Sequence, residues 1–162
     1  MSDILQKIQE RVFSQCGYQV SKLIKEPESA DYEACRFQID KKQVISRTAK
    51  LTPKKNGQFV TFWKRIRKGP IEPFHENDNF DFFVINIKLD NRLGQFVFPK
   101  KVLAEKGVIS TNNKEGKRGF RVYPVWDNPN SGQAVKTQIW QLSYFFEMNN
   151  LLDLKKVKQL YT

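Results

Sequence analysis

The sequence predicts an α+β fold in which a single mixed, largely antiparallel sheet is flanked by helices. Segments that alternate apolar and polar residues fill the middle of the chain, whereas segments with helical spacing lie mainly towards its ends. The 162 residues include 13 Phe and are 40% hydrophobic, which is enough for one buried core. We therefore expect one domain, 1–162, made of a helical N-terminal segment (1–30), a core (31–148) and a C-terminal helix (149–162).

The N-terminal part of the chain is expected to form helices and then a hairpin. Apolar residues at helical spacing predict a first helix capped by Ser2 or Asp3. A short segment over 20–25 completes the helical N-terminal segment. Period-two alternation predicts a strand over 32–39, and 42–49 is its expected hairpin partner.

The middle of the chain supplies the remaining strands of the sheet. A Pro and an Asn-Gly pair mark 52–57 as a turn into a strand over 58–66, and the acidic stretch 71–79 is expected to be a loop. The segment 81–89 is apolar on both faces, which is typical of a central strand covered on both sides. Residues 95–98 are its expected hairpin partner.

The C-terminal third is expected to be mainly helical. A preceding proline and a following glycine predict a helix over 100–106. A polar, basic loop over 110–119 then leads into a strand over 119–125. Apolar spacing predicts an amphipathic helix over 133–148 and a final basic helix over 151–160.

A short repeat suggests where part of the charge is held. The tetrapeptide Gly-Gln-Phe-Val occurs at 57–60 and again at 94–97. Each copy leads into an aromatic residue or a proline and then a basic pair. We interpret each copy as a glycine turn that opens a strand and presents cations at a sheet edge.

Charge is the strongest functional signal. The formal net charge of +11 and a pI near 9.7 are typical of proteins that bind nucleic acids. A stretch without acids contains eight cations, which are Arg47, Lys50, Lys54, Lys55, Lys64, Arg65, Arg67 and Lys68. Interleaved rings are typical of single-strand binding, because cations follow the phosphates and ring faces stack on unpaired bases. We expect Phe59 and Phe62 to lie in the core, whereas Trp63 fits either role.

A second basic group follows in the sequence. It consists of Lys100, Lys101, Lys106, Lys114, Lys117, Arg118 and Arg121. The glycine-rich segment 114–119 is either a phosphate-contact loop or a plain surface turn. The lysines at 155, 156 and 158 are expected to form a solvated helix face.

Other classes of function have little support in the sequence. There is one histidine and no Gly-x-Ser-x-Gly elbow, so we expect no enzyme activity, no metal and no cofactor. Cys16 and Cys35 form no disulfide framework, which fits a reducing compartment. Since there is also no apolar run of about 20 residues and no signal-peptide core, we expect a cytoplasmic protein without a membrane span.

A set of short motifs runs through most of the chain. They are AKLTPKK at 49–55, GQFV at 57–60, WKR at 63–65, GPI at 69–71, GQFVFPK at 94–100, GKR at 116–118, RVYP at 121–124, QA at 133–134 and TQ at 137–138. Together these motifs resemble the MepB family, small bacterial proteins often encoded beside a multidrug efflux pump. The resemblance implies a PD-(D/E)XK nuclease-like (restriction-endonuclease-like) core over 31–148. In that core 58–66, 81–89 and 95–98 would form a three-strand meander, 99–106 the crossover helix and 119–125 the fourth strand.

The same resemblance implies where a nuclease site would lie. A working site needs an Asp at the start of the second strand, and an acid and a Lys two residues apart on the third; the carboxylates hold Mg²⁺. Asp81 stands at the first position, but Gln95 and Val97 occupy the other two. One carboxylate without its partner binds Mg²⁺ weakly. We therefore expect Asp81 and Gln95 to be vestiges of a catalytic site.

These observations predict a nucleic-acid-binding protein on a degenerate nuclease-like scaffold. RNA or single-stranded DNA is the expected ligand, with double-stranded DNA bound more weakly. The expected contact residues are Lys50, Lys54, Lys55, Trp63, Lys64, Arg65, Arg67, Lys68, Lys100, Lys101, Lys117, Arg118 and Arg121. Two alternatives stay open. One is a protein-interaction module; the other is an active metal-dependent nuclease with a migrated site, in which Asp81 recruits partners from Glu33, Glu72, Glu76, Asp78, Lys64 and Lys100.

Overall fold

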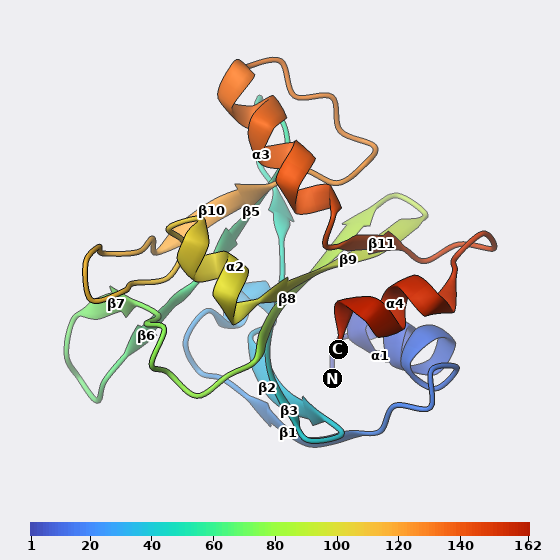
Figure 1. Ribbon diagram of the computed structural model, residues 1–162, viewed down its shortest axis with the longest axis horizontal. Helices are drawn as coiled ribbons and strands as arrows, with labels where there is room; N and C mark the ends of the chain where they lie inside the picture. Colours follow the sequence, from blue (N-terminus) through green and yellow to red (C-terminus); the bar gives the residue numbers. More distant parts are fainter.

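The computed structural model describes residues 1–162 and is built around a six-stranded sheet with helices on both faces (Figure 1). The strand order is β1-β2-β3-β8-β9-β11. The strands are β1 (Val20–Lys25), β2 (Cys35–Ile39), β3 (Lys42–Thr48), β8 (Phe82–Leu89), β9 (Arg92–Pro99) and β11 (Phe145–Glu147). All neighbouring pairs are antiparallel except β3 and β8, which are parallel. This confirms the predicted α+β fold with a mixed, largely antiparallel sheet.

Strand β8 lies at the centre of the sheet and is covered on both sides, as its apolar faces predict. Phe83 and Ile85 belong to one buried cluster, which also includes Leu103 of helix α2 (Lys100–Glu105). Phe82 and Val84 belong to a second cluster on the opposite face. That face is covered by α1 (Asp3–Ile8), the π-helical turn η1 (Gln9–Phe13) and α4 (Leu154–Leu160), which lie together in Figure 1.

The helix ends follow the expected local chemistry. Ser2 caps α1, because its Oγ accepts a hydrogen bond from the backbone N–H of Leu5 at 3.3 Å. Gly107, just beyond α2, has φ +72°, a left-handed conformation that favours glycine. Helix α3 (Gly132–Leu142) is capped by Ser131. A short 3₁₀ turn, η2 (Ala30–Tyr32), precedes β2.

The predicted strand over 58–66 is wrong as a single strand, because the chain turns at Phe62. Its first part, β5 (Gln58–Thr61), pairs with β4 (Lys50–Leu51) and β10 (Gly119–Val122); its second part, β6 (Trp63–Arg65), pairs with β7 (Ile71–Pro73). The Phe62 side chain is fully buried and stacks on Phe83 at 3.7 Å between ring centroids. The ring lies on the same buried face as Val60, and the chain changes sheets directly after it.

The strand assignment for the nuclease-like meander is therefore also wrong. The strand that adjoins β8 opposite β9 is β3, and it runs parallel to β8. Neither β5 nor β10, the expected fourth strand, belongs to the main sheet. The segment 71–79, expected to be a loop, also contributes β7.

Two predictions of helix near the chain ends are wrong. Val20–Lys25 is the edge strand β1, paired with β2 through an irregular register, so the segment 1–30 is not wholly helical. The helix expected over 133–148 ends at Leu142, and Phe145–Glu147 then forms β11 at the opposite edge of the sheet. Phe145 and Phe146 enter the two different buried clusters. A strand places consecutive rings on opposite faces, and a helix does not.

The two glycines of the repeat serve packing more than turning. A Cβ on Gly57, which has φ +77°, would lie 2.7 Å from ring carbons of Tyr123. Gly94 lies inside β9, so its interpretation as a turn is wrong; a Cβ there would lie 2.6 Å from the ring of Phe145. Each glycine makes room for an aromatic ring from a later segment.

None of the helices is both long and apolar enough to cross a bilayer.

Candidate functional site

Two adjoining hollows, of about 460 and 590 Å³, lie where β10, the turn before β5 and α3 meet. They have four residues in common: Arg121, Tyr123, Ser131 and Ala134. We call them together the basic groove, because their lining contains five cations, which are Lys54, Lys55, Lys106, Lys117 and Arg121. No Asp or Glu lines either hollow. The groove therefore concentrates positive charge on a concave surface.

Arg121 fixes one wall of the basic groove. Its Nη1 donates to the carbonyl oxygen of Asn56 at 3.1 Å, and its Nη2 donates to Oγ1 of Thr52 at 2.6 Å. These bonds hold the 52–57 turn against β10, so that Lys54 and Lys55 lie beside Arg121. Gly57, at the end of this turn, allows the turn to approach β10 closely, because a Cβ there would lie 2.8 Å from the carbonyl oxygen of Val122. Arg121 is thus both a groove cation and the residue that positions two others.

Helix α3 forms the opposite wall and is fixed to β10 by a buried glutamine. Gln141 is 0% exposed. Its Nε2 donates to the carbonyl oxygen of Arg121, and its Oε1 accepts from the N–H of Tyr123, both at 2.9 Å. The side chain thus takes the place of a neighbouring strand at the free edge of β10. Gln138 adds hydrogen bonds to the carbonyl oxygens of Pro124 and Asp127.

The third side of the basic groove comes from the end of α2 and the 110–119 loop. Lys106 follows α2, and its Nζ lies over the ring of Trp140, 5.4 Å from the centroid. In the loop, the N–H of Gly116 donates to Oγ of Ser110, and the N–H of Lys117 donates to the carbonyl oxygen of Val108, both at 2.8 Å. These two amides are used internally, so this loop offers the Lys117 side chain to a ligand rather than a glycine-rich cradle.

Other expected contact residues lie in a separate group, the hairpin cluster, which consists of Lys64, Glu72, Asp78 and Lys100. The Nζ of Lys64 is 2.8 Å from Oδ1 of Asp78 and 3.5 Å from Oε1 of Glu72. The Nζ of Lys100 donates to the carbonyl oxygen of Asp78. The structure therefore brings these side chains together, but with the charge of Lys64 opposed by two carboxylates.

The remaining expected contact residues are scattered. Arg65 pairs with Glu28 at 3.6 Å and lies over the ring of the half-buried Trp63 at 5.7 Å. Arg118 pairs with Glu115, and Lys50 lies over the ring of Tyr32. Three are exposed and form no ion pair: Arg67, Lys68 and Lys101. Only four of the thirteen expected contact residues line the basic groove, and these are Lys54, Lys55, Lys117 and Arg121.

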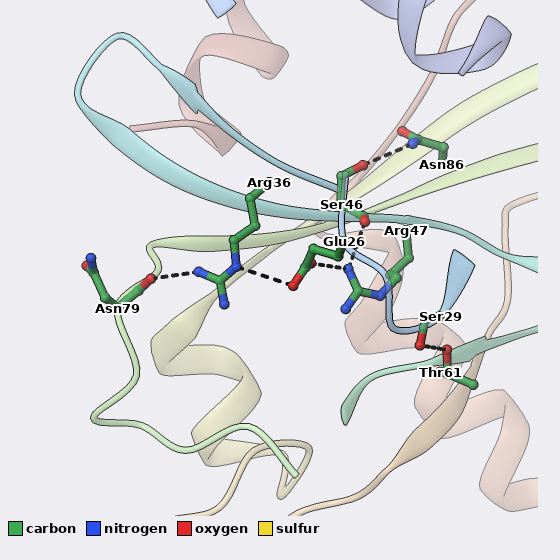
Figure 2. A network of polar contacts seen from close by, with 8 residues as sticks. All are labelled: Glu26, Ser29, Arg36, Ser46, Arg47, Thr61, Asn79 and Asn86. Atoms are coloured by element: carbon green, nitrogen blue, oxygen red, sulfur yellow. Dashed lines mark hydrogen bonds and ion pairs between the residues drawn. The ribbon is translucent and has the colours of Figure 1, made fainter. Parts of the chain in front are cut away.

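Arg47, the first cation of the acid-free stretch, is buried. Its side chain is 1% exposed, and Nη1 donates to Oε1 of Glu26 at 2.9 Å and to the carbonyl oxygen of Ser46 at 3.0 Å. Figure 2 shows Glu26 between Arg47 and Arg36, whose Nε lies 3.5 Å from the same carboxylate. Burial lowers the pKa of Arg47, and the charge of Glu26 opposes that shift. This residue stabilises the fold and is not available to a ligand.

Asp81 and Gln95, the expected catalytic vestiges, do not share a site. Asp81 caps the pairing of β3 and β8, since its Oδ2 accepts from the N–H of Gln43 at 2.8 Å. Gln95 is fully buried; its Nε2 donates to Oδ1 of Asn86 at 2.9 Å, and its Oε1 accepts from the hydroxyl of Tyr161. Gln95 lies opposite Asn86, five positions along β8 from Asp81, or about 17 Å at the rise of an extended strand. Both side chains support the fold.

Replacing Tyr161 by Phe tests this buried network. Near neutral pH we expect a loss of about 1–3 kcal/mol in the free energy of unfolding, because Oε1 of Gln95 stays buried without its donor. Burial also raises the pKa of Tyr161 well above its ordinary value. Above a pH of about 10 the unfolded chain loses this proton and the folded chain keeps it, so this group alone lowers the wild-type free energy of unfolding by about 1.4 kcal/mol per pH unit.

The Phe variant lacks that ionisation. The difference between its free energy of unfolding and that of the wild type is therefore expected to narrow as the pH rises above about 10. Urea denaturation of both proteins, near neutral pH and in alkaline buffer, measures the difference. A constant deficit at all pH values would show that Tyr161 ionises no differently in the folded and unfolded chains.

Sequence reasoning missed three residues of the basic groove and its support. Lys106 belongs to the second basic group but is not among the expected contacts; its position at the end of a predicted helix is the available signal. Trp140 and Gln141 lie within a predicted amphipathic helix, where nothing in the sequence distinguishes them from surface residues.

The fold and the groove define a class: a small, basic α+β protein with an acid-free groove beside the three-stranded sheet of β4, β5 and β10. A family model described as MepB-like matches residues 26–147, and the chain belongs to this family. A solved structure described as the crystal structure of MepB is 34% identical, with a TM-score of 0.80 over 93% of this chain and 99% of that chain. A bacterial homing endonuclease shows 15% identity and a TM-score of 0.45 over 86% and 84% of the two chains. None of the curated proteins compared with the chain matches it.

Proposed function

We propose that the basic groove binds the phosphate backbone of a nucleic acid. The observation that carries the proposal is the lining of the groove, which has five cations and no carboxylate. Backbone binding depends on such cations, because each phosphate that they neutralise releases counterions. The net charge of +11 adds long-range attraction for a polyanion.

The basic groove is a better candidate than the hairpin cluster. A polyanion at the hairpin cluster would meet the carboxylates of Glu72 and Asp78 and would have to compete with them for Lys64. Oδ2 of Asp78 is also occupied, since it accepts from the N–H of His75 at 2.8 Å. Asp81, the acid around which a migrated nuclease site would form, points its carboxylate at Gln43. These contacts favour binding in the groove over catalysis at the hairpin.

The proposal places the protein in the cytoplasm. The two thiols support that compartment, because Cys16 and Cys35 are unpaired.

The proposal also includes a preference for RNA or single-stranded DNA over double-stranded DNA. That preference cannot rest on Phe59 and Phe62, since Phe62 is fully buried and Phe59 packs against Tyr32. It needs a ring that lines the groove.

A salt titration tests the proposal. If the five groove cations each contact a phosphate, log K for a single strand is expected to fall with log salt with a slope of about −3.5. Fluorescence anisotropy with labelled RNA, single-stranded DNA and duplex DNA, between about 0.05 and 0.2 M salt, measures it. No binding at the lowest salt would refute the proposal. Cleavage of the labelled strands in parallel samples with Mg²⁺ would instead favour the nuclease alternative.

A further inference from the structure

We infer that Trp140 is a base-stacking position in the basic groove, an inference that rests on the proposed function. Trp140 projects from α3, is half-buried, and lines the same hollow as Lys106, Lys117 and Arg121. Its ring packs against the buried ring of Phe98, with 5.4 Å between centroids. The indole is thus supported from the core and reaches the groove beside three cations.

The contact between Lys106 and Trp140 shows how a nucleotide would bind there. The ammonium of Lys106 lies over the indole, where the ring attracts a cation. A base that stacks on this face displaces the ammonium, because an exposed lysine–aromatic contact is weaker than a base–aromatic stack. Lys106 stays in the groove after this displacement and is free to contact the phosphate of the same nucleotide.

The other two tryptophans are less suited to this role. Trp63 lies on β6 next to Lys64, whose charge is opposed by Asp78 and Glu72, and it lines neither hollow of the groove. Trp126 packs against Phe145 and also lies outside both hollows. Trp140 therefore takes the role for which the sequence offered Trp63.

A stacking position at Trp140 accounts for a preference for single strands. In a duplex both faces of a base are covered by its neighbours, so a base must be unstacked before an indole can cover it. In a flexible single strand the same face is free. The cations of the groove would hold either form by its phosphates, and Trp140 would favour the unpaired one.

Binding of two strands with the same number of phosphates tests the inference. One is an oligothymidylate, and the other is an abasic strand of equal length. Trp140→Ala is expected to weaken oligothymidylate binding by about tenfold, which lies within the range of a lost base–aromatic stack. It should leave binding of the abasic strand unchanged. Trp140→Phe keeps an aromatic face and is expected to retain most of the affinity for oligothymidylate.

The outcomes separate the inference from the proposed function. An equal loss of affinity for both strands, or no loss for either, overturns the stacking position while the groove still binds. A larger loss for oligothymidylate in Trp63→Ala than in Trp140→Ala also overturns it. If the wild-type protein binds neither strand at low salt, the proposed function fails, and the inference fails with it.

Discussion

Replacing Lys54, Lys55 and Lys117 together by glutamate is expected to weaken binding of single-stranded nucleic acid by at least about a hundredfold at 0.1 M salt. The three side chains line the basic groove and are exposed, so their loss removes charge without opening a cavity. From the dependence of single-strand binding on salt, each lost phosphate contact lowers the affinity roughly fivefold. The introduced carboxylates add repulsion to that loss.

A matched variant separates the groove from the net charge. Replacing the three lysines at 155, 156 and 158 by glutamate makes the same change in charge on α4, which covers the opposite face of the sheet (Figure 1). Anisotropy titrations of both variants should show a large loss for the groove variant and a small one for the α4 variant. Equal losses would mean that the attraction depends on overall charge, and would contradict the assignment of the groove.

Glu26→Ala is expected to destabilise the protein by about 3–5 kcal/mol, because it leaves the charge of Arg47 buried without its partner. The Arg47 side chain is 1% exposed, and its Nε already has no hydrogen-bond partner. The carbonyl oxygen of Ser46 would be its one remaining acceptor. Removing the acid from such a pair costs more than the pair itself contributes, since the cation is not rehydrated.

Glu28→Ala is the control for this effect. Glu28 pairs with Arg65 at 3.6 Å, and both side chains are more than a third exposed. The free energy of unfolding is therefore expected to fall by no more than about 1 kcal/mol. Urea denaturation of the two variants and the wild type measures the difference. If Glu26→Ala is no more destabilising than Glu28→Ala, water reaches Arg47 in a way that its burial does not suggest.

Where the sequence predicted the fold correctly, local patterns were enough. The central position of β8 follows from a strand that is apolar on both faces, and α2 follows from a proline at its start and a glycine beyond its end. Period-two alternation continues through Phe62, so nothing local shows that β5 and β6 lie in different sheets. The separation appears only in the pairing of β6 with β7, which local alternation does not encode.

The candidate site was predictable only in part for a similar reason. Cation density in the sequence picked out Lys54, Lys55, Lys117 and Arg121 in two separate basic groups, and the fold then brings the four together in one groove. It could not show that Lys64 faces Asp78, fourteen positions further along the chain. It also could not show that the Gln141 side chain forms hydrogen bonds with the backbone of Arg121 and Tyr123 at the free edge of β10. Pairing of this kind depends on tertiary contacts, which composition does not encode.

The attachment of the 52–57 turn to Arg121 has a consequence for protein synthesis. A nascent chain carries Lys54 and Lys55 long before Arg121 is added, and α3, which holds β10 through Gln141, follows later still. The groove therefore does not exist on the ribosome until the chain beyond Gln141 has emerged. This order delays assembly of the groove until most of the protein has been made.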